Sequence, residues 1–261
     1  MNNHEIDYKL FGEEMQCVEI ELDPQEAVIA EPGSFMMMTD GIQMQTLFGD
    51  GNESGFMSKL FSAGKRLLTG ENLFMTVYTN NSYQKRQVTF AAPYAGKIIP
   101  MDLERLGNKI ICQKDSFLCA AKGVSVGIEF QKKLGTGLFG GEGFIMQKLE
   151  GDGMAFVHSG GHVVEKELQS GELLKVDTGC LVAFTSNVNY DIQFVGGIKN
   201  TLFGGEGVFY ATLRGPGKVW IQTLPISRLA GRILQYGTGA RKEEGSILGG
   251  IGNLLDGDGI R

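Results

Sequence analysis

The chain has 261 residues, a formal net charge of −6 at pH 7 and 39 glycines. The negative charge repels nucleic-acid phosphates unless a local basic patch overrides it, which argues against a nucleic-acid-binding protein. No stretch approaches the roughly 18 apolar residues of a membrane-spanning helix, and the first residues lack the basic and apolar regions of a secretion signal. We therefore expect a protein that is neither exported nor threaded through a membrane.

Four cysteines are spread along the chain without a Cys-x-x-Cys pair: Cys17, Cys112, Cys119 and Cys180. This spacing is typical of reduced thiols in a cytosolic core rather than of a disulfide framework. A chain of this length also buries enough apolar surface to fold without a disulfide or a structural metal. The cysteine pattern thus predicts a cytoplasmic protein with no cofactor.

The excess of glycine predicts an all-β fold, because glycine adopts positive φ at no steric cost and so marks tight turns between short strands. Apolar runs bounded by turn residues predict buried strands at 27–30, 117–121 and 181–185. Each run follows a turn that contains an aspartate, at positions 23, 115 and 177. We interpret these three runs as equivalent strands of a repeated unit.

Residues 52–68 predict an amphipathic helix inserted into the first unit. Its apolar face consists of Phe56, Met57, Leu60, Phe61, Leu67 and Leu68, and its opposite face carries Lys59, Lys65 and Arg66. One interpretation is a helix that caps an open end of the first unit. The other is an interaction element whose basic edge suits an anionic membrane surface or an acidic partner.

A glycine–glutamate step recurs along the chain and defines the repeats. The run Leu-Phe-Gly-Gly-Glu-Gly at 138–143 returns 64 residues later at 202–207, and a fainter copy lies at 68–74. Each copy precedes two apolar strands joined by a turn rich in glycine or asparagine. The predicted strands are 73–78 and 88–92, 144–149 and 154–157, and 208–213 and 219–223.

These patterns predict three double-stranded β-helix-like or sandwich units in a pseudo-threefold arrangement, since single units of this size have marginal cores and must pack together. The predicted repeats span about 16–103, 104–168 and 169–235 within one compact β domain, 1–235. An apolar stripe that begins at Ile226, directly after Pro225, predicts a C-terminal helix. The glycine-rich residues 236–261 predict a loose tail.

Three motifs carry a resemblance to a known family: Glu-Pro-Gly-Ser-Phe-Met at 31–36, Arg-Leu-Leu-Thr-Gly-Glu-Asn-Leu-Phe at 66–74, and the doubled Phe-Gly-Gly-Glu-Gly. With them the chain resembles a bacterial member of the altered-inheritance-of-mitochondria family over residues 4 to about 235. The resemblance implies a fold like that of the tryptophan RNA-binding attenuation protein. It brings no catalytic residues, and the effect of fungal members on mitochondrial membrane organisation points to a scaffold.

His158 and His162 have the spacing of two zinc ligands only if they lie on a helix. The glycines between them place them across a strand end and a turn, so we predict that they bind no metal. Alignment of the repeats within the chain puts Pro93 and Gln222 opposite His158, and Lys97 opposite His162.

Glu71, Glu142 and Glu206 occupy equivalent positions in the three repeats. In a pseudo-threefold assembly they could converge into an acidic cluster. The simpler interpretation is that each glutamate accepts backbone hydrogen bonds in a turn that precedes a strand.

Three consecutive methionines, Met36, Met37 and Met38, have Met44 nearby. Thioether ligands select copper, yet no cysteine or histidine lies in this segment. We therefore expect these methionines to fill irregular gaps in the core, as methionine does in most proteins.

The sequence offers no catalytic constellation that supports an enzyme. It has three histidines, with His4 at the start of the chain, and no Gly-x-Ser-x-Gly motif. The Phe-Gly-Gly-Glu-Gly run lacks the Lys-Ser/Thr ending of a phosphate loop. The pairs of basic residues at 65–66, 85–86 and 132–133 are a weak basis for binding RNA.

We therefore predict a non-enzymatic binding or scaffold protein that forms a homo-oligomer, with a trimer as one form. Its partner would be a protein or a membrane surface. The first alternative is a small-molecule or metal-binding β protein with its site between repeats. The second is an RNA-binding protein, which rests on fold analogy alone.

Overall fold

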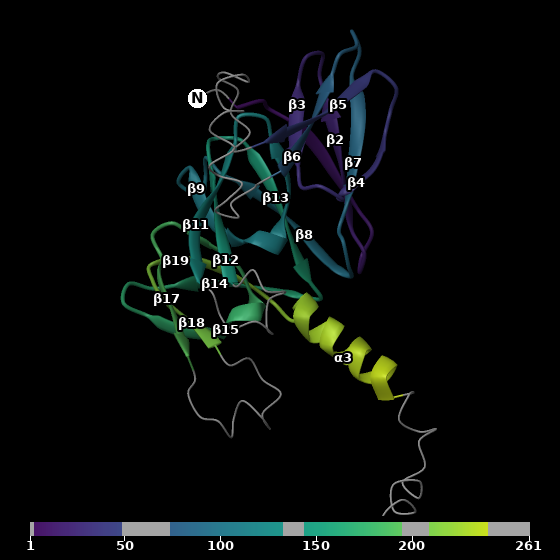
Figure 1. The fold of residues 1–261 in the computed structure, drawn as a ribbon. Coiled ribbons are helices and arrows are strands. Elements are labelled where there is room, and N and C mark those ends of the chain that lie inside the picture. The colour runs from purple at the N-terminus through teal and green to yellow at the C-terminus, as the bar shows by residue number, and fades with distance from the viewer. Residues whose placement is uncertain (1–2, 49–73, 133–143, 195–208, 240–261) are drawn as a thin grey trace, which may run out of the picture. The chain divides into compact units, whose positions relative to one another are not determined.

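The computed structural model describes residues 3–48, 74–132, 144–194 and 209–239. These residues form short β-strands, two 3₁₀ turns and one α-helix (Figure 1). The chain divides into a β unit, Met1–Pro225, and a C-terminal unit, Ile226–Arg261. The predicted all-β class and the C-terminal helix are confirmed.

The described residues of the β unit form four antiparallel sheets (Figure 1). Sheet A has the order β1-β2-β7-β4, with β1 (Asp7–Phe11), β2 (Cys17–Leu22), β7 (Arg86–Ala91) and β4 (Phe35–Met38). Sheet B has the order β5-β6-β3-β10-β13-β8, with β5 (Ile42–Phe48), β6 (Phe74–Asn80), β3 (Ala27–Ala30), β10 (Phe117–Ala121), β13 (Met154–Gly160) and β8 (Gly96–Asp102).

The other two sheets follow in chain order. Sheet C has the order β11-β12-β9-β16-β19-β14, with β11 (Ser125–Lys132), β12 (Phe144–Glu150), β9 (Lys109–Gln113), β16 (Leu181–Thr185), β19 (Gly217–Gln222) and β14 (Val163–Leu168). Sheet D has the order β15-β18-β17, with β15 (Leu173–Asp177), β18 (Phe209–Arg214) and β17 (Asn189–Phe194). The 3₁₀ turns η1 (Lys114–Ser116) and η2 (Thr178–Cys180) precede β10 and β16.

The order of strand pairing recurs along the chain. We call β3–β8, β9–β14 and β15–β19 pairing repeats 1, 2 and 3. In each repeat the first strand and the third strand pair with the fourth, as in β3-β6-β5, β9-β12-β11 and β15-β18-β17. The second strand pairs with the fifth, as in β4–β7, β10–β13 and β16–β19. The recurrence concerns pairing, and the pseudo-threefold axis stays a prediction.

The pairing repeats interlock, because each six-stranded sheet takes strands from two of them. Sheet B combines β5, β6, β3 and β8 of repeat 1 with β10 and β13 of repeat 2, and sheet C combines repeats 2 and 3 in the same way. The junctions are the antiparallel pairs β3–β10 and β9–β16. Backbone hydrogen bonds therefore cross every boundary between repeats.

A β-bulge at the second strand of each repeat shows which strands are equivalent. The pairing register shifts at Met36 in β4, at Leu118 in β10 and at Val182 in β16. The counterpart of the buried run 117–121 is therefore β4. The predicted equivalence of 27–30 with that run is wrong, because repeat 1 begins at β3 and its second strand follows one short turn later.

Burial follows the position of each strand in its sheet. In β2, Val18, Ile20 and Leu22 are fully buried and alternate with partly exposed residues, as expected for a strand with one face on the core. Every residue of β10 and of β16 is buried, because both strands lie inside six-stranded sheets. Phe156 of β13 is fully buried in the larger apolar cluster, and the ring of Tyr8 packs edge-on against it at 4.9 Å.

The C-terminal unit contains α3 (Ile226–Gly239), which begins directly after Pro225. Within the described ranges, no helix has the length and apolar character needed to cross a membrane. The helix predicted within 52–68 lies outside the described residues.

We expect the interlocked sheets to unfold in one cooperative transition, and Phe156→Ala tests this. Loss of the buried ring in repeat 2 should lower the free energy of unfolding by about 3–5 kcal/mol. The chain has one tryptophan, Trp220 in β19 of repeat 3. Its fluorescence in a urea titration should shift to the same lower midpoint as the far-UV circular dichroism signal.

The control for this experiment is Val164→Ala, a change at a side chain that is 36% exposed in β14, the next strand along the chain. It should leave the midpoint nearly unchanged. Separate midpoints for the two signals in Phe156→Ala would show that repeat 3 unfolds on its own, contrary to our expectation.

Candidate functional site

Strand β4 exposes large apolar side chains at the edge of sheet A. Phe35, Met36, Met37 and Met38 are 40%, 53%, 51% and 40% exposed. The ring of Phe35 stacks on Tyr78 at 5.5 Å between centroids, so this side chain is anchored on the core side of the sheet. Among the described residues β4 pairs with β7 alone. We call Phe35–Met38 with its unpaired backbone the β4 edge.

The equivalent strands of the other repeats have no such edge. Strand β10 pairs with β13 on one side and with β3 on the other, and β16 pairs with β19 and β9. All residues of both strands are buried. Among the strands that the structure describes, none takes the place beside β4 that β3 takes beside β10 and β9 takes beside β16.

The prediction that Met36, Met37 and Met38 fill gaps in the core is wrong. Their exposure follows from the position of β4 at the end of the array of repeats. Four large apolar residues in succession, Phe-Met-Met-Met, do not alternate with polar ones. This lack of alternation is typical of a strand whose two faces are both covered.

The turn before β4 ties the β4 edge to repeat 2. The backbone N–H of Glu31 donates to the carbonyl of Leu118 at 3.0 Å, and the N–H and hydroxyl of Ser34 donate to the carbonyl of Glu31 at 3.2 and 2.7 Å. Burial raises the pKa of the Glu31 carboxyl to about 7. Both ends of the turn are thus held by backbone hydrogen bonds, which places the start of β4.

His158 lies inside sheet B and is 1% exposed. Its Nε2 is 3.1 Å from the carbonyl oxygen of Tyr94, and the two rings meet edge-on at 4.4 Å. Its Nδ1 is buried without a partner. Burial lowers the pKa of this imidazole to about 4, with the Tyr94 carbonyl opposing the shift. His158 is therefore neutral at pH 7 and fastens β13 to the segment before β8.

His162 lies in the turn between β13 and β14, where its backbone N–H donates to the hydroxyl of Thr223 at 2.9 Å. The register of β13 with β10 and of β19 with β16 makes Gln222 the equivalent of His158, as predicted. The equivalent in repeat 1 is Ala91 rather than Pro93. Over the described ranges, no group of three or more histidine, cysteine, aspartate or glutamate side chains could hold a metal ion.

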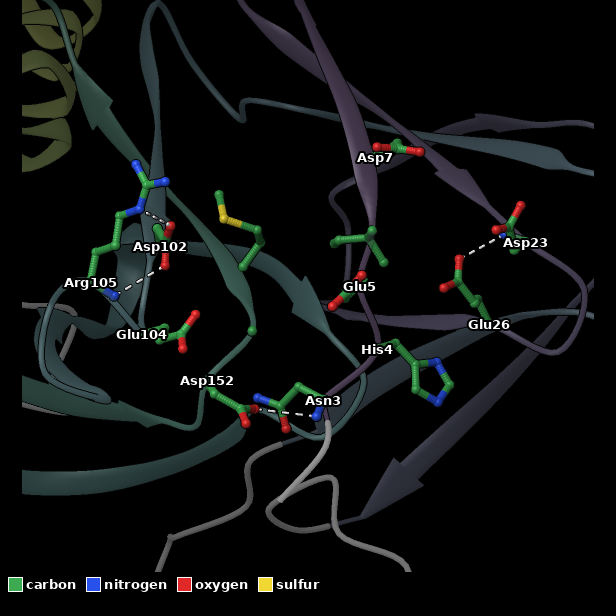
Figure 2. Close-up of a pocket in the computed structure, with 13 residues that line it drawn as sticks. Asn3, His4, Glu5, Asp7, Asp23, Glu26, Asp102, Glu104, Arg105 and Asp152 are labelled. Carbon is green, nitrogen blue, oxygen red and sulfur yellow. Dashed lines mark hydrogen bonds and ion pairs between the residues drawn. The ribbon is translucent and has the colours of Figure 1, made fainter.

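A hollow of about 1160 Å³ opens between the N-terminal residues, the β2–β3 turn and the ends of β8 and β13 (Figure 2). Its lining is acidic and includes Glu5, Asp7, Asp23, Glu26, Asp102, Glu104 and Asp152, and Arg105 is the one arginine or lysine among the described residues that line it. Several of these carboxylates are engaged with neighbouring groups.

The interactions in this hollow cap two turns and fix the N-terminal segment (Figure 2). Glu26 accepts from the N–H of Asp23 at 2.7 Å. Asp102 accepts from the N–H of Arg105 at 3.2 Å and pairs with its guanidinium at 3.1 Å. Asp152 accepts from the N–H of Asn3 at 3.2 Å, which fixes the N-terminal segment. Glu26 and Asp102 thus cap local turns, whereas Asp152 holds the N-terminal segment against the β12–β13 turn.

The remaining predicted site residues lie outside the described residues. They are the acidic cluster Glu71, Glu142 and Glu206, and the interaction helix with Phe56, Met57, Leu60, Phe61, Lys65 and Arg66. Both stay predictions.

Comparisons with known proteins agree with the fold. The molecule is an all-β protein whose antiparallel sheets are built from recurring strands. It belongs to the family described as Mitochondrial biogenesis AIM24, whose model matches residues 8–224. The resemblance identified from the sequence motifs is therefore confirmed.

Two relatives come from Streptococcus pyogenes. The chain is 28% identical over 221 residues to the uncharacterized protein M6_Spy0233 of serotype M6, covering 84% of this chain and 86% of that protein. The crystal structure of protein SPYM3_0169 matches with a TM-score of 0.71 at 23% identity, over 89% of this chain and 100% of that one. The second similarity supports the fold.

The buried neutral state of His158 predicts a loss of stability in acid. Because the fold lowers the pKa from 6.5 to about 4, the unfolded chain binds a proton in this range and the folded chain does not. The contribution is complete above pH 6.5 and is lost as the pH falls toward 4. Between about pH 8 and pH 5 this residue should account for about 2 kcal/mol of the free energy of unfolding.

The measurement is urea unfolding of the wild type and of His158→Gln at each pH, since the amide can still donate to the Tyr94 carbonyl. The difference between the two proteins isolates His158 from Glu31, whose raised pKa acts in the opposite direction. His162→Gln, at an exposed position, is the matched control. Parallel pH profiles for wild type and His158→Gln would contradict the prediction.

Proposed function

We propose that this chain is a non-enzymatic binding or scaffold protein that binds a protein partner through the β4 edge. The observation that carries the proposal is the contrast between repeats. The four residues of β4 are exposed, whereas every residue of the equivalent strands β10 and β16 is buried by a neighbouring strand. The sheet order of the molecule itself thus defines what the β4 edge lacks, namely one antiparallel strand.

The backbone of the β4 edge is oriented to accept that strand. The N–H of Thr39 donates to the carbonyl of Gln87 in β7 at 2.9 Å. Because successive residues of a strand point their backbone groups to opposite sides, the N–H and C=O of Met38 point away from β7. Strand addition to such an edge gains backbone hydrogen bonds and buries the apolar side chains.

The composition of the β4 edge favours a protein over a membrane surface. Residues 34–40 contain no lysine or arginine and end in Asp40. Segments that bind anionic membranes combine apolar residues with basic ones. Methionine side chains adapt to irregular protein surfaces, which suits a protein-binding strand.

The non-enzymatic part of the proposal is supported by the roles of the polar groups. His158 bonds a backbone carbonyl inside the sheet, and carboxylates of the acidic hollow cap turns. These groups serve the fold rather than a reacting molecule.

A photo-reactive benzophenone amino acid at Met36 tests the proposal in cells. If β4 binds a protein, irradiation should give a covalent adduct at Met36, and mass spectrometry identifies the partner. The control position is Tyr83, which is 99% exposed in the turn between β6 and β7. It should give no adduct.

A backbone variant then distinguishes strand pairing from incidental contact. Met38→Pro removes the outward N–H and leaves the β4–β7 hydrogen bonds intact, since proline is tolerated at a sheet edge. It should abolish the Met36 adduct, and Met38→Ala should retain it. An adduct that persists in Met38→Pro, or none at Met36, would refute binding through the β4 edge.

A further inference from the structure

We infer that the strand that pairs with the β4 edge is β15 of a second copy of this chain, so that copies join head to tail. This inference rests on the proposed function and names its partner. It follows from the two ends of the array of repeats, which are complementary in the same way as the strands inside it.

Strand β15 is an edge strand whose equivalents lie inside their sheets. It is the first strand of repeat 3, and among the described residues it pairs with β18 alone. Its equivalents β3 and β9 pair on their other side with β10 and β16. All four residues of β3 are buried, whereas Leu173 of β15 is 47% exposed. The edge of β15 therefore lacks a strand equivalent to β10 or β16, and β4 is that strand in repeat 1.

The two internal junctions share one register. Cys119 lies opposite Ala30 in the β10–β3 pair, and Ala183 lies opposite Cys112 in the β16–β9 pair. The bulges make Met37 the equivalent of Cys119 and Ala183. In the first strand of each repeat, Ala30, Cys112 and Val176 are equivalent. They lie opposite Thr76, Gln147 and Ala211 of the fourth strand.

Transfer of this register to the contact between copies gives a defined set of pairs. Met37 of one copy lies opposite Val176 of the other, Met38 opposite Lys175, and Thr39 opposite Leu174. The alternation of hydrogen bonds agrees with it, because Thr39 bonds β7 and Met38 is therefore the residue that bonds outward.

The sheet that results has the same order as sheets B and C. Joining sheet D of one copy to sheet A of the next gives the order β17-β18-β15 from the first copy followed by β4-β7-β2-β1 from the second. In sheets B and C the strand beside β13 or β19 comes from the preceding repeat, as β8 or β14. Strand β2 already fills this place beside β7, and repeat 3 continues into α3 after β19. Each position of the joined sheet is therefore filled by one strand, and none is left empty or claimed by two strands.

Lys175 is the charged residue that this register places against β4. Its equivalents in the other repeats are Ile29 and Ile111, which are buried. In the single chain its ammonium lies 5.0 Å from the centroid of the Tyr210 ring. A lysine on an open edge opposes indiscriminate strand addition, and its aliphatic stem can still cover Met38 of the neighbouring copy.

Disulfide trapping between two single-cysteine variants tests the register. Met37 and Val176 would form a pair without mutual hydrogen bonds, in which Cα atoms are about 4.5 Å apart, and this spacing suits a disulfide. Met37→Cys and Val176→Cys are made in a chain with Cys17→Ser and Cys180→Ser, since these two thiols are partly exposed. The two variants are co-expressed with different tags and oxidised mildly.

We expect a disulfide-linked heterodimer in the mixture and none in either variant alone. Met38→Cys paired with Val176→Cys should not link, because neighbouring residues point to opposite faces of the strand. Met38→Pro in the Met37→Cys chain should abolish the heterodimer, and Met38→Ala should retain it. Retained far-UV circular dichroism and an unchanged melting temperature verify that each variant is folded.

A folded mixture that gives no heterodimer would overturn the inference, as would Met37→Cys chains that link to each other. The first result combined with a Met36 adduct to a different protein would leave the proposed function standing and refute the second copy as partner. An adduct between two copies of this chain, together with the heterodimer, would support both.

Discussion

The antiparallel pairs β3–β10 and β9–β16 hold the molecule together, and most of its other features depend on them. Each pair joins the first strand of one repeat to the second strand of the next by backbone hydrogen bonds. Because these strands then lie inside six-stranded sheets, their two faces are both covered, and residues as small as Ala120 and Ala183 become fully buried. A sandwich with this connection has no boundary at which a repeat could separate without breaking a sheet.

Buried polar side chains at equivalent positions also join neighbouring repeats. His158 in β13 contacts the Tyr94 carbonyl, and its equivalent Gln222 in β19 accepts from the N–H of Gly160 at 2.7 Å and donates to the carbonyl of Gly179 at 2.7 Å. Gln222 thus gives a hydrogen-bond partner to the backbone N–H at the end of β13 in repeat 2 and to a backbone carbonyl in the turn before β16 in repeat 3. Polar groups buried in this way are costly unless paired, so they favour one arrangement of the repeats over others.

Local features of the fold could be predicted from the sequence, and the non-local ones could not. The strands at 144–149 and 154–157 were predicted because apolar runs flank the glycine-rich turn 151–153, and this signal is local. The exchange of strands between repeats left no such signal, since pairing across repeats depends on contacts far apart in sequence. The aspartate turns misled the alignment of the first repeat, because its second strand, Phe35–Met38, follows Glu-Pro-Gly-Ser instead.

The candidate site shows the same division. The composition of Phe35–Met38 is that of a buried strand, and it was predicted as part of the core. Its exposure arises from its place at the end of the array, which no residue within the segment encodes. His158 was predicted to lie at a strand end because of the glycines that follow it, whereas β13 continues beyond it to Gly160 and buries its side chain. Its single hydrogen bond to Tyr94 depends on the pairing of β8 with β13 and could be found only in the structure.

The exchange of strands between repeats also has a consequence for synthesis on the ribosome. Sheet B requires β13, so repeat 1 cannot complete its own sheet until residues up to Gly160 have been translated. Sheet C in turn waits for β19, which ends at Gln222. Nascent β3, β5 and β6 must therefore emerge with an incomplete sheet edge, since domains fold as units once their parts are available. Each six-stranded sheet is therefore completed only after strands of the following repeat have been translated, and β3 has no partner on its β10 side until residue 121 has been made.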